Sequence, residues 1–250
     1  MPKSIDIYFR GSSDGGYKFG DTKRIINSTS HPLMQTFQVA TSGKYIYVIW
    51  AMQNAKGNIG SMFMRSADNG TTFDRPINLS KNSGENNSTF PSAISVSDNK
   101  VYIVLDNYIF KNNTLAQSEL LFERSTDNGL SFSDTVRLSG SSPLAYPKEI
   151  LNNQLVASGK NVYVAWIKYD DTLHNSTLFL TKSNDNGSSF DTSKSIATNL
   201  DYMKLATSGN NLYVLLEVPV PNIEDNTTHS SPGMDGYNLS KHRLCKDSSH

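Results

Sequence analysis

Among the side chains that could carry out acid–base chemistry, the most regularly placed are carboxylates that recur in one motif. The motif is Ser-x-Asp-x-Gly-x-x-Phe, and its aspartates are Asp14, Asp68, Asp127 and Asp185, at spacings of 54, 59 and 58 residues. Glycoside hydrolysis needs two carboxyl groups that face each other. The same motif is also typical of a tight turn, because Asp and Ser side chains bond nearby backbone amides. We therefore interpret these four aspartates as structural and not catalytic.

The elements that must position the motif are β-hairpins. Asp-Asn-Gly between two apolar runs predicts a hairpin turn, and glycine suits a position with positive φ. The phenylalanine is expected to fold back into the core, where its burial would contribute about 1.5–3 kcal/mol. We call each copy a box; the boxes cover residues 12–19, 66–73, 125–132 and 183–190. Their defining residues are Ser12, Asp14, Gly16, Phe19, Ser66, Asp68, Gly70, Phe73, Ser125, Asp127, Gly129, Phe132, Ser183, Asp185, Gly187 and Phe190.

The box resembles the Asp-box, or BNR repeat, of the sialidase-like β-propellers of the neuraminidase superfamily. Four copies in step carry this resemblance over about residues 5 to 217. It implies an all-β propeller of four-stranded antiparallel blades. It also implies that each box lies in the turn between the third and fourth strands of a blade, on the side away from the active site. Asp-boxes also occur in propellers that are not sialidases, so the resemblance implies a fold more than an activity.

Repetition at this period indicates a repeat architecture. The apolar runs predict three complete units, with second strands at 45–50, 101–105 and 162–167, between two half-units. The first half-unit supplies third and fourth strands, and the last supplies first and second strands. Pairing of strand 5–10 with strand 212–217 would close a ring of four blades and remove open edges. An open arc of a larger propeller and a ring shared by two chains are the alternatives.

Two segments differ in composition. Residues 1–218 are expected to form the propeller. Residues 219–250 lose the repeat, contain Pro219, Pro221 and Pro232, and offer little apolar area to offset the entropy of ordering. They predict a mobile polar tail.

Composition excludes several classes of function. The chain has 250 residues, with 23 Lys plus Arg against 23 Asp plus Glu, so no net field favours nucleic acid. Cys245 is the only cysteine, and the five histidines show no ligand spacing, so we predict no metal and no cofactor. No segment is long and apolar enough to span a membrane, and no signal peptide is visible after Met1.

Ten Asn-x-Ser/Thr sequons, together with the family resemblance, predict an extracellular or cell-surface location. An Asn- and Ser-rich β-protein also produces sequons by chance. The sequons begin at Asn27, Asn69, Asn78, Asn86, Asn87, Asn112, Asn175, Asn186, Asn226 and Asn238.

A binding site is expected on the face opposite the boxes, because that face carries long loops that differ between units. The expected loops are 51–58, 106–117, 168–176 and 217–229, joined by 28–36, 80–91 and 139–153. Aromatic residues beside carboxylates are typical of a carbohydrate site, and these loops carry such residues. The candidates are Asp106, Tyr108, Tyr169, Asp170 and Glu217.

The sialidase resemblance further implies a cluster of three arginines and an Arg-Ile-Pro segment, and neither pattern is present. Arg65 and Arg124 hold a repeated position before the box, and Arg24, Arg75 and Arg137 hold one after it. We therefore predict a non-catalytic module that binds glycans or surface proteins or acts as a scaffold. The alternatives are a divergent exo-α-sialidase or other glycoside hydrolase, and a truncated product without its own function. Oligomers through open blade edges are a further expectation.

Overall fold

The computed structural model describes residues 6–27, 33–54, 56–80, 87–112, 114–139, 150–170 and 175–219. The chain divides into a unit Met1–Pro219 and a unit Val220–His250. All described residues belong to the first unit, so the predicted tail beyond Pro219 stays a prediction.

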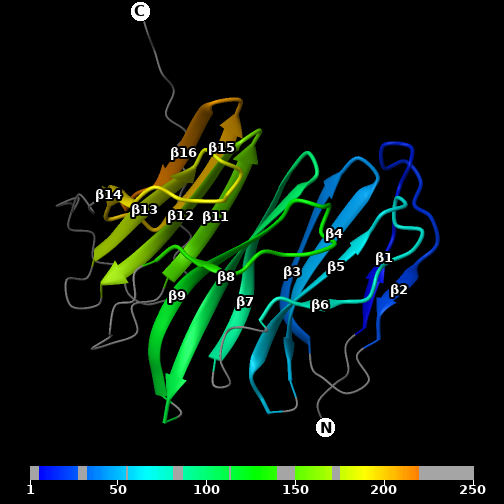
Figure 1. Ribbon diagram of the computed structural model, residues 1–250, viewed down its shortest axis with the longest axis horizontal. Coiled ribbons are helices and arrows are strands. Elements are labelled where there is room, and N and C mark those ends of the chain that lie inside the picture. The colour runs from blue at the N-terminus through cyan, green and yellow to red at the C-terminus, as the bar shows by residue number, and fades with distance from the viewer. Residues whose placement is uncertain are drawn as a thin grey trace, which may run out of the picture. The chain divides into compact units, whose positions relative to one another are not determined.

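The described residues form strands and no helix, which confirms the all-β prediction (Figure 1). Three sheets have four antiparallel strands and two have two. The two-stranded sheets are β1 (Ile7–Phe9) with β2 (Lys23–Ile26), and β15 (Tyr202–Ser208) with β16 (Asn211–Glu217). The first four-stranded sheet contains β3 (Leu33–Ser42), β4 (Tyr45–Gln53), β5 (Ile59–Ser66) and β6 (Ile77–Asn78). The second contains β7 (Asn87–Ser97), β8 (Lys100–Lys111), β9 (Thr114–Ser125) and β10 (Val136–Arg137). The third contains β11 (Ile150–Ser158), β12 (Asn161–Asp170), β13 (Asn175–Ser183) and β14 (Lys194–Thr198).

Each four-stranded sheet is one blade, and its strands pair in chain order. The structure corrects the loop predictions, because strands extend into the loops expected at 28–36, 51–58, 80–91, 139–153 and 168–176. The largest change is at residues 106–117, which are not a loop. Strands β8 and β9 pair as far as Lys111 and Thr114, leaving only two residues between them. Tyr108, Ile109 and Phe110 favour strand continuation, and this preference outweighs the polar residues around them.

The expected closure of the ring is not formed within the described residues. β1 pairs with β2, and β16 pairs with β15, as two separate sheets. Each end of the row of blades is therefore a half-blade with an open strand edge.

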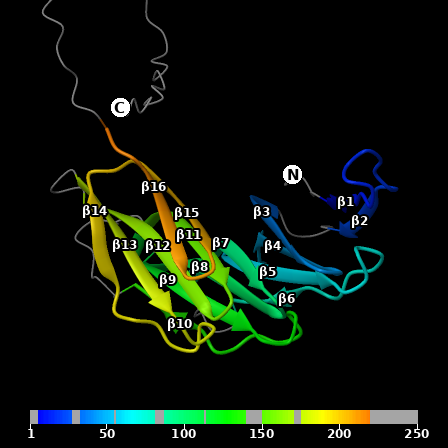
Figure 2. The same cartoon turned by 90° about the horizontal axis from the view of Figure 1, so that it is seen from above.

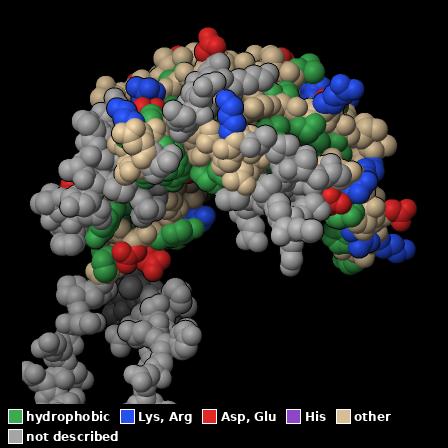
Figure 3. Space-filling view, turned by 90° about the horizontal axis from the view of Figure 1, so that it is seen from below, with side chains coloured by type: hydrophobic (Ala, Val, Ile, Leu, Met, Phe, Trp, Pro, Cys, Tyr) green, Lys and Arg blue, Asp and Glu red, His purple; other side chains and the backbone are tan. Residues whose placement is uncertain are grey.

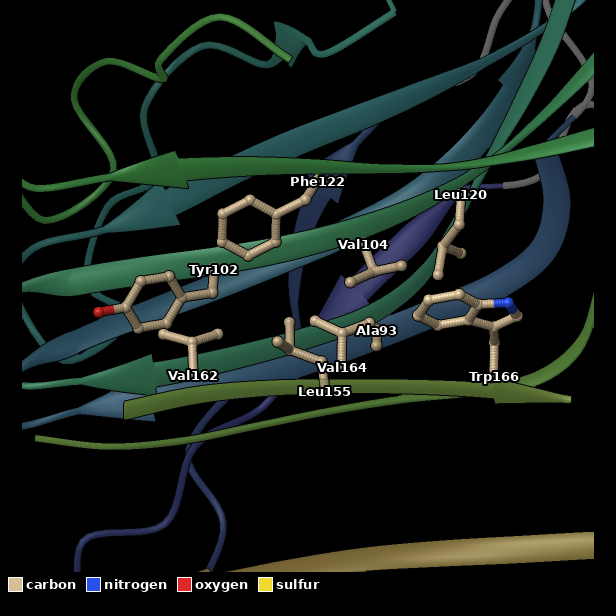
Figure 4. Close-up of a cluster of buried hydrophobic side chains, with 9 residues drawn as sticks. All are labelled: Ala93, Tyr102, Val104, Leu120, Phe122, Leu155, Val162, Val164 and Trp166. Atoms are coloured by element: carbon tan, nitrogen blue, oxygen red, sulfur yellow. The ribbon is translucent and has the colours of Figure 1, made fainter. Parts of the chain in front are cut away.

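Apolar clusters join each blade to the next, and one lies between the β7–β10 and β11–β14 blades. Figure 4 shows Tyr102, Val104 and Phe122 facing Val162 and Val164 across this boundary. Further clusters join β3–β6 to β7–β10, β11–β14 to the last half-blade, and the first half-blade to β3–β6. The sheets follow one another in chain order (Figure 2), and the core is a series of apolar layers between them.

The boxes turn the chain between the third strand of a blade and the segment that leads to its fourth. In the second box, the Gly70 N–H donates to Ser66 Oγ at 2.9 Å, and the Ser66 hydroxyl donates to Asp68 Oδ1 at 2.8 Å. The Thr72 N–H and hydroxyl both donate to the Asp68 carboxylate. These bonds, the Thr72 hydroxyl first, lower the pKa of Asp68 to about 2. The carboxylate is therefore fully occupied by its own turn.

The boxes of the complete blades also form hydrogen bonds with neighbouring turns and blades. The Asn69 N–H donates to Lys44 O at 2.9 Å, so the box lies beside the turn between β3 and β4. The Arg65 guanidinium donates to Asn128 O of the next box at 2.9 Å, and Arg124 donates likewise to Asn186 O at 3.1 Å. We call these two hydrogen bonds between successive blades the arginine latches.

Box phenylalanines pack edge-on against a phenylalanine of the preceding blade. The ring centroids are 5.2 Å apart for Phe73 and Phe9, 4.7 Å for Phe132 and Phe63, and 4.8 Å for Phe190 and Phe122. These box rings are partly buried. Among the described residues no blade precedes the first box, and its Phe19 is 56% exposed.

Candidate functional site

The five residues predicted for a binding face lie on the second strands of three different sheets. Asp106 and Tyr108 lie within β8, and the ring centroids of Tyr108 and Phe90 are 5.7 Å apart. Tyr169 and Asp170 end β12, and Glu217 ends β16 and is exposed. Placing Asp106, Tyr108, Tyr169 and Asp170 in loops is therefore wrong, because β8 and β12 are longer than their apolar runs.

Asp106, on the second strand β8, belongs to a polar network that also includes side chains from the first strands of three successive blades. The Asn153 amide donates to Asp106 Oδ1 and, at 3.3 Å, to Ser92 Oγ. Across the next boundary, the Gln38 amide donates to Ser92 O at 2.6 Å. Desolvation raises the pKa of Asp106 to about 7, although hydrogen bonds from Asn153 and Ser92 oppose this rise. This network ties blades together around a carboxyl that is half-protonated near neutral pH.

A raised pKa in the folded state makes stability fall as pH rises. The contribution of Asp106 is complete below its unfolded pKa of about 4 and is lost as pH rises through 7. Asp106→Asn is therefore expected to flatten the decline in unfolding free energy between pH 4 and 7, by up to about 1.4 kcal/mol per pH unit. Urea denaturation at pH 4 to 8 measures this slope. An unchanged slope would contradict the burial of a protonated Asp106.

A pocket of about 390 Å³ lies on the side of the β7–β10 blade that faces the β3–β6 blade. We call it the strand pocket. It is lined by Leu79, Ser80, Asn87, Thr89, Leu105, Asn107, Ile109, Glu119, Leu121, Glu123, Asp134, Thr135 and Arg137. Its volume is in the range of small-molecule sites.

Polar side chains of β8, β9 and β10 line part of the strand pocket. The Asn107 amide donates to Glu119 Oε2 at 3.4 Å, and Arg137 Nη2 lies 3.2 Å from Glu119 Oε1. Asn107 is only 3% exposed, and its Oδ1 accepts no hydrogen bond within the described part of the chain. A buried acceptor without a donor is costly, so a ligand that brings an O–H or N–H is favoured there.

Glu123 is the second buried carboxyl of the strand pocket. Desolvation raises its pKa to about 7, against a hydrogen bond from the Thr135 hydroxyl at 3.0 Å. Glu119 and Glu123 are four residues apart on one strand, so their Cα atoms lie roughly 13 Å apart. They share a face of the sheet, and only Glu119 is paired with Arg137.

A second pocket, of about 270 Å³, adjoins the first and shares Ser80 and Asn87 with it. We call it the loop pocket. It includes residues of the predicted loop 51–58, namely Met52, Asn54, Lys56 and Asn58, and it is completed by Ile59, Gly60, Met62 and Asn78. The Asn54 carboxamide accepts from the Lys56 and Asn58 backbone amides, which fixes this loop.

The described surface holds no cluster of His, Cys, Asp and Glu that suits a metal ion, and all five histidines lie outside the described residues. Figure 3 shows basic and acidic side chains dispersed over the face seen from below. Within the described part of the chain, no helix is long and apolar enough to cross a membrane.

Comparison with solved structures identifies the fold. The chain resembles a Hadza microbial sialidase with a TM-score of 0.55 and 13% identity, over 73% of this chain and 41% of that one. A Trypanosoma rangeli sialidase in complex with 2,3-difluorosialic acid gives 0.52 and 14%, over 85% and 37%. The fold is that of a sialidase-like β-propeller. A PL25 ulvan lyase bound to a GlcA–Rha3S saccharide gives 0.53 and 13%, over 86% of this propeller and 57% of the lyase.

The likeness concerns the fold alone at these identities. The propeller described here spans 41%, 37% and 57% of the lengths of those three proteins. No protein-family model and no curated protein matches the sequence.

Sequence reasoning missed the strand pocket. Asn107 fell in a predicted loop, and Glu119 and Glu123 lay at or within a run treated as an ordinary third strand. The available signal was a glutamate at position 123, inside the apolar run 120–124, because a buried strand rarely carries an unpaired carboxylate.

Proposed function

We propose that this sialidase-like propeller is a non-catalytic, extracellular or cell-surface module that binds carbohydrate in the strand pocket. The observation that carries the proposal is Asn107, a buried amide whose oxygen lacks a donor inside a pocket lined by further amides and hydroxyls. Sugar hydroxyls both donate and accept, so they match such a lining.

The charge of the pocket supports a polar ligand. Arg137 is half-exposed at its opening and is already paired with Glu119. A guanidinium in this position can donate to a ligand hydroxyl or carboxylate while it keeps the ion pair. Carbohydrates are also the ligands in the similar structures, where a sialidase holds 2,3-difluorosialic acid and a lyase holds GlcA–Rha3S.

Three features favour binding over catalysis. Arg65 and Arg124, two of the repeated arginines, donate to box carbonyls and are not directed at a ligand. The box carboxylates are occupied by their own turns. In the strand pocket, Glu119 is held in an ion pair.

Arg137→Ala is expected to weaken binding of sialylated or uronate-containing oligosaccharides about tenfold, because one charge-assisted hydrogen bond is lost. Calorimetric titration with sialyllactose and a glucuronate disaccharide measures the change. Arg24→Ala is the matched control, since Arg24 is equally exposed and forms a 3.3 Å ion pair with Asp6 outside the pocket. Equal affinities for the two variants would contradict the proposed site.

A divergent glycoside hydrolase is the second candidate, and Glu123 is the observation that favours it. A buried carboxyl with a pKa of about 7 has the protonation behaviour of a general acid, although Glu119 on the same strand is roughly 13 Å away and so is not its paired carboxylate. Hydrolysis of a sialoside or another glycoside, abolished by Glu123→Gln, would establish this function and remove the non-catalytic proposal. Loss of such activity in Asp106→Asn instead would place the chemistry at the inter-blade network.

A further inference from the structure

The two half-blades at the ends of the row carry complementary strands. The β1–β2 half has the third-strand type, the box 12–19 and the fourth-strand type, and the β15–β16 half has the first and second types. In every complete blade the second and third strands are hydrogen-bonded partners. The open edge of β16 therefore lacks the partner that β1 represents (Figure 1).

Residues of β16 are exposed at positions that are buried in all complete blades. Tyr213 is 56% exposed, whereas its equivalents Tyr47, Tyr102 and Tyr163 are buried. Leu215 is 73% exposed, and its equivalents Ile49, Val104 and Ala165 are fully buried. These equivalences follow from the common register of strands one and two.

The opposite end of the row also exposes side chains whose equivalents are buried in the other blades. Val39 of β3 is 63% exposed, although its equivalents Leu155 and Leu205 are buried. Tyr8 of β1 is 57% exposed. At the boundary between the β3–β6 and β7–β10 blades, Ile49 and Ile94 belong to one cluster. Leu215 and Val39 are the equivalents of that pair, one on each end.

We propose that β1 of a second copy of this chain pairs with β16, so that the two half-blades form one complete blade between copies. The register of the complete blades places Tyr8 opposite Leu216 and Phe9 opposite Leu215. The β3–β6 blade of the second copy then covers Tyr213 and Leu215 with Val39. This interface continues the inter-blade packing already present within one chain.

The first box also fits this contact. In complete boundaries the box glycine lies on an aromatic ring of the preceding blade, as Gly129 does on Phe63 and Tyr47. Gly16 has open space within 4 Å in its own chain. In the assembly, Gly16 and Phe19 of the second copy lie over Leu180 and Tyr163 of the first. Lys182 holds the position of Arg65 and Arg124, and so donates to the Gly15 carbonyl.

A second copy is the occupant that the structure favours, because it brings a matching strand, a matching box and a matching apolar face together. Contacts of this head-to-tail kind close into rings or extend into open chains. The contact leaves the strand pocket untouched, so the inference does not rest on the proposed function.

Sedimentation equilibrium of the full chain tests the association. The expected result is a mass above 27.7 kDa that rises with concentration. Leu215→Lys places a charge in the contact and is expected to shift the equilibrium at least tenfold toward monomer. Leu130→Lys is the matched control, because Leu130 is 62% exposed within the box 125–132 of a complete blade. A chain that stays monomeric at all concentrations would overturn the proposal.

Cross-linking tests whether the strand that pairs with β16 comes from a second copy. In a Cys245→Ser background, Tyr8→Cys and Leu216→Cys proteins are mixed and treated with a short bismaleimide. A heterodimer between the two variants supports pairing between copies, and a Tyr8→Cys with Leu130→Cys mixture is the control. If the double variant Tyr8→Cys/Leu216→Cys links only within one chain, the edge is closed by the same molecule and the second copy is ruled out.

Discussion

Phe122→Ala is expected to lower the free energy of unfolding by about 3–5 kcal/mol. Phe122 is fully buried, and its ring packs edge-on at 4.8 Å against Phe190 and lies 6.1 Å from Tyr102. Truncation removes the ring on which the last box rests, so it leaves a cavity at the boundary between two blades. Urea denaturation with a fluorescence readout measures the loss.

Phe19→Ala is the matched control for this truncation. Phe19 is the phenylalanine of the first box and is exposed within one chain, so its loss from the monomer is expected to cost less than about 1 kcal/mol. Phe132 is intermediate, because it is only partly buried against Phe63, and Phe132→Ala is expected near the lower end, at about 3 kcal/mol. Equal effects for Phe122 and Phe19 would refute the view that boxes stabilise through the preceding blade.

Gly187→Ala is the second change with a large expected effect, a loss of about 2–5 kcal/mol. Gly187 has a φ of 77°, where an L residue costs about 1–2 kcal/mol. A Cβ there would also lie 2.8 Å from the Phe122 ring, and overpacking of this kind costs about 1–3 kcal/mol more. The two costs arise from different causes and are expected to add. Thermal and urea unfolding measure their sum.

Gly16→Ala separates these two costs. Gly16 has a φ of 93° but open space around it within one chain, so only the backbone cost of about 1–2 kcal/mol is expected when the variant is measured as a monomer. The difference between the two alanine variants then measures the contact between a box and the ring beneath it. Equal losses would show that backbone strain accounts for the whole effect and that the Phe122 ring yields freely.

The repeat made the fold predictable. Gly70, Gly129 and Gly187 marked the turns, and the strand order followed from their spacing. The extent of β8 could not be predicted, because Asp106 and Asn107 read as a loop while tertiary pairing with β9 keeps them in a strand. Ring closure also depends on how blades are oriented, and no local pattern encodes that.

The strand pocket was beyond sequence reasoning for a different reason. Asn107, Glu119 and Arg137 come from three strands of one blade, and each is unremarkable in its own segment. Their meeting depends on the register of β8, β9 and β10 and on the neighbouring blade that buries them. Asn54 and Lys56, which line the loop pocket, lie within the expected loop 51–58, and the prediction of a binding face there stays a prediction.

The arginine latches are local, and this allows the number of repeats in such a chain to change. Each latch, box ring and box glycine reaches only the adjacent blade. The energetics then resemble a one-dimensional array, in which stability is a sum over units and nearest neighbours. Duplication or loss of one whole repeat of 54 to 59 residues would recreate the same boundary chemistry on both sides. Blade number can therefore vary in evolution while the residues at every junction stay the same.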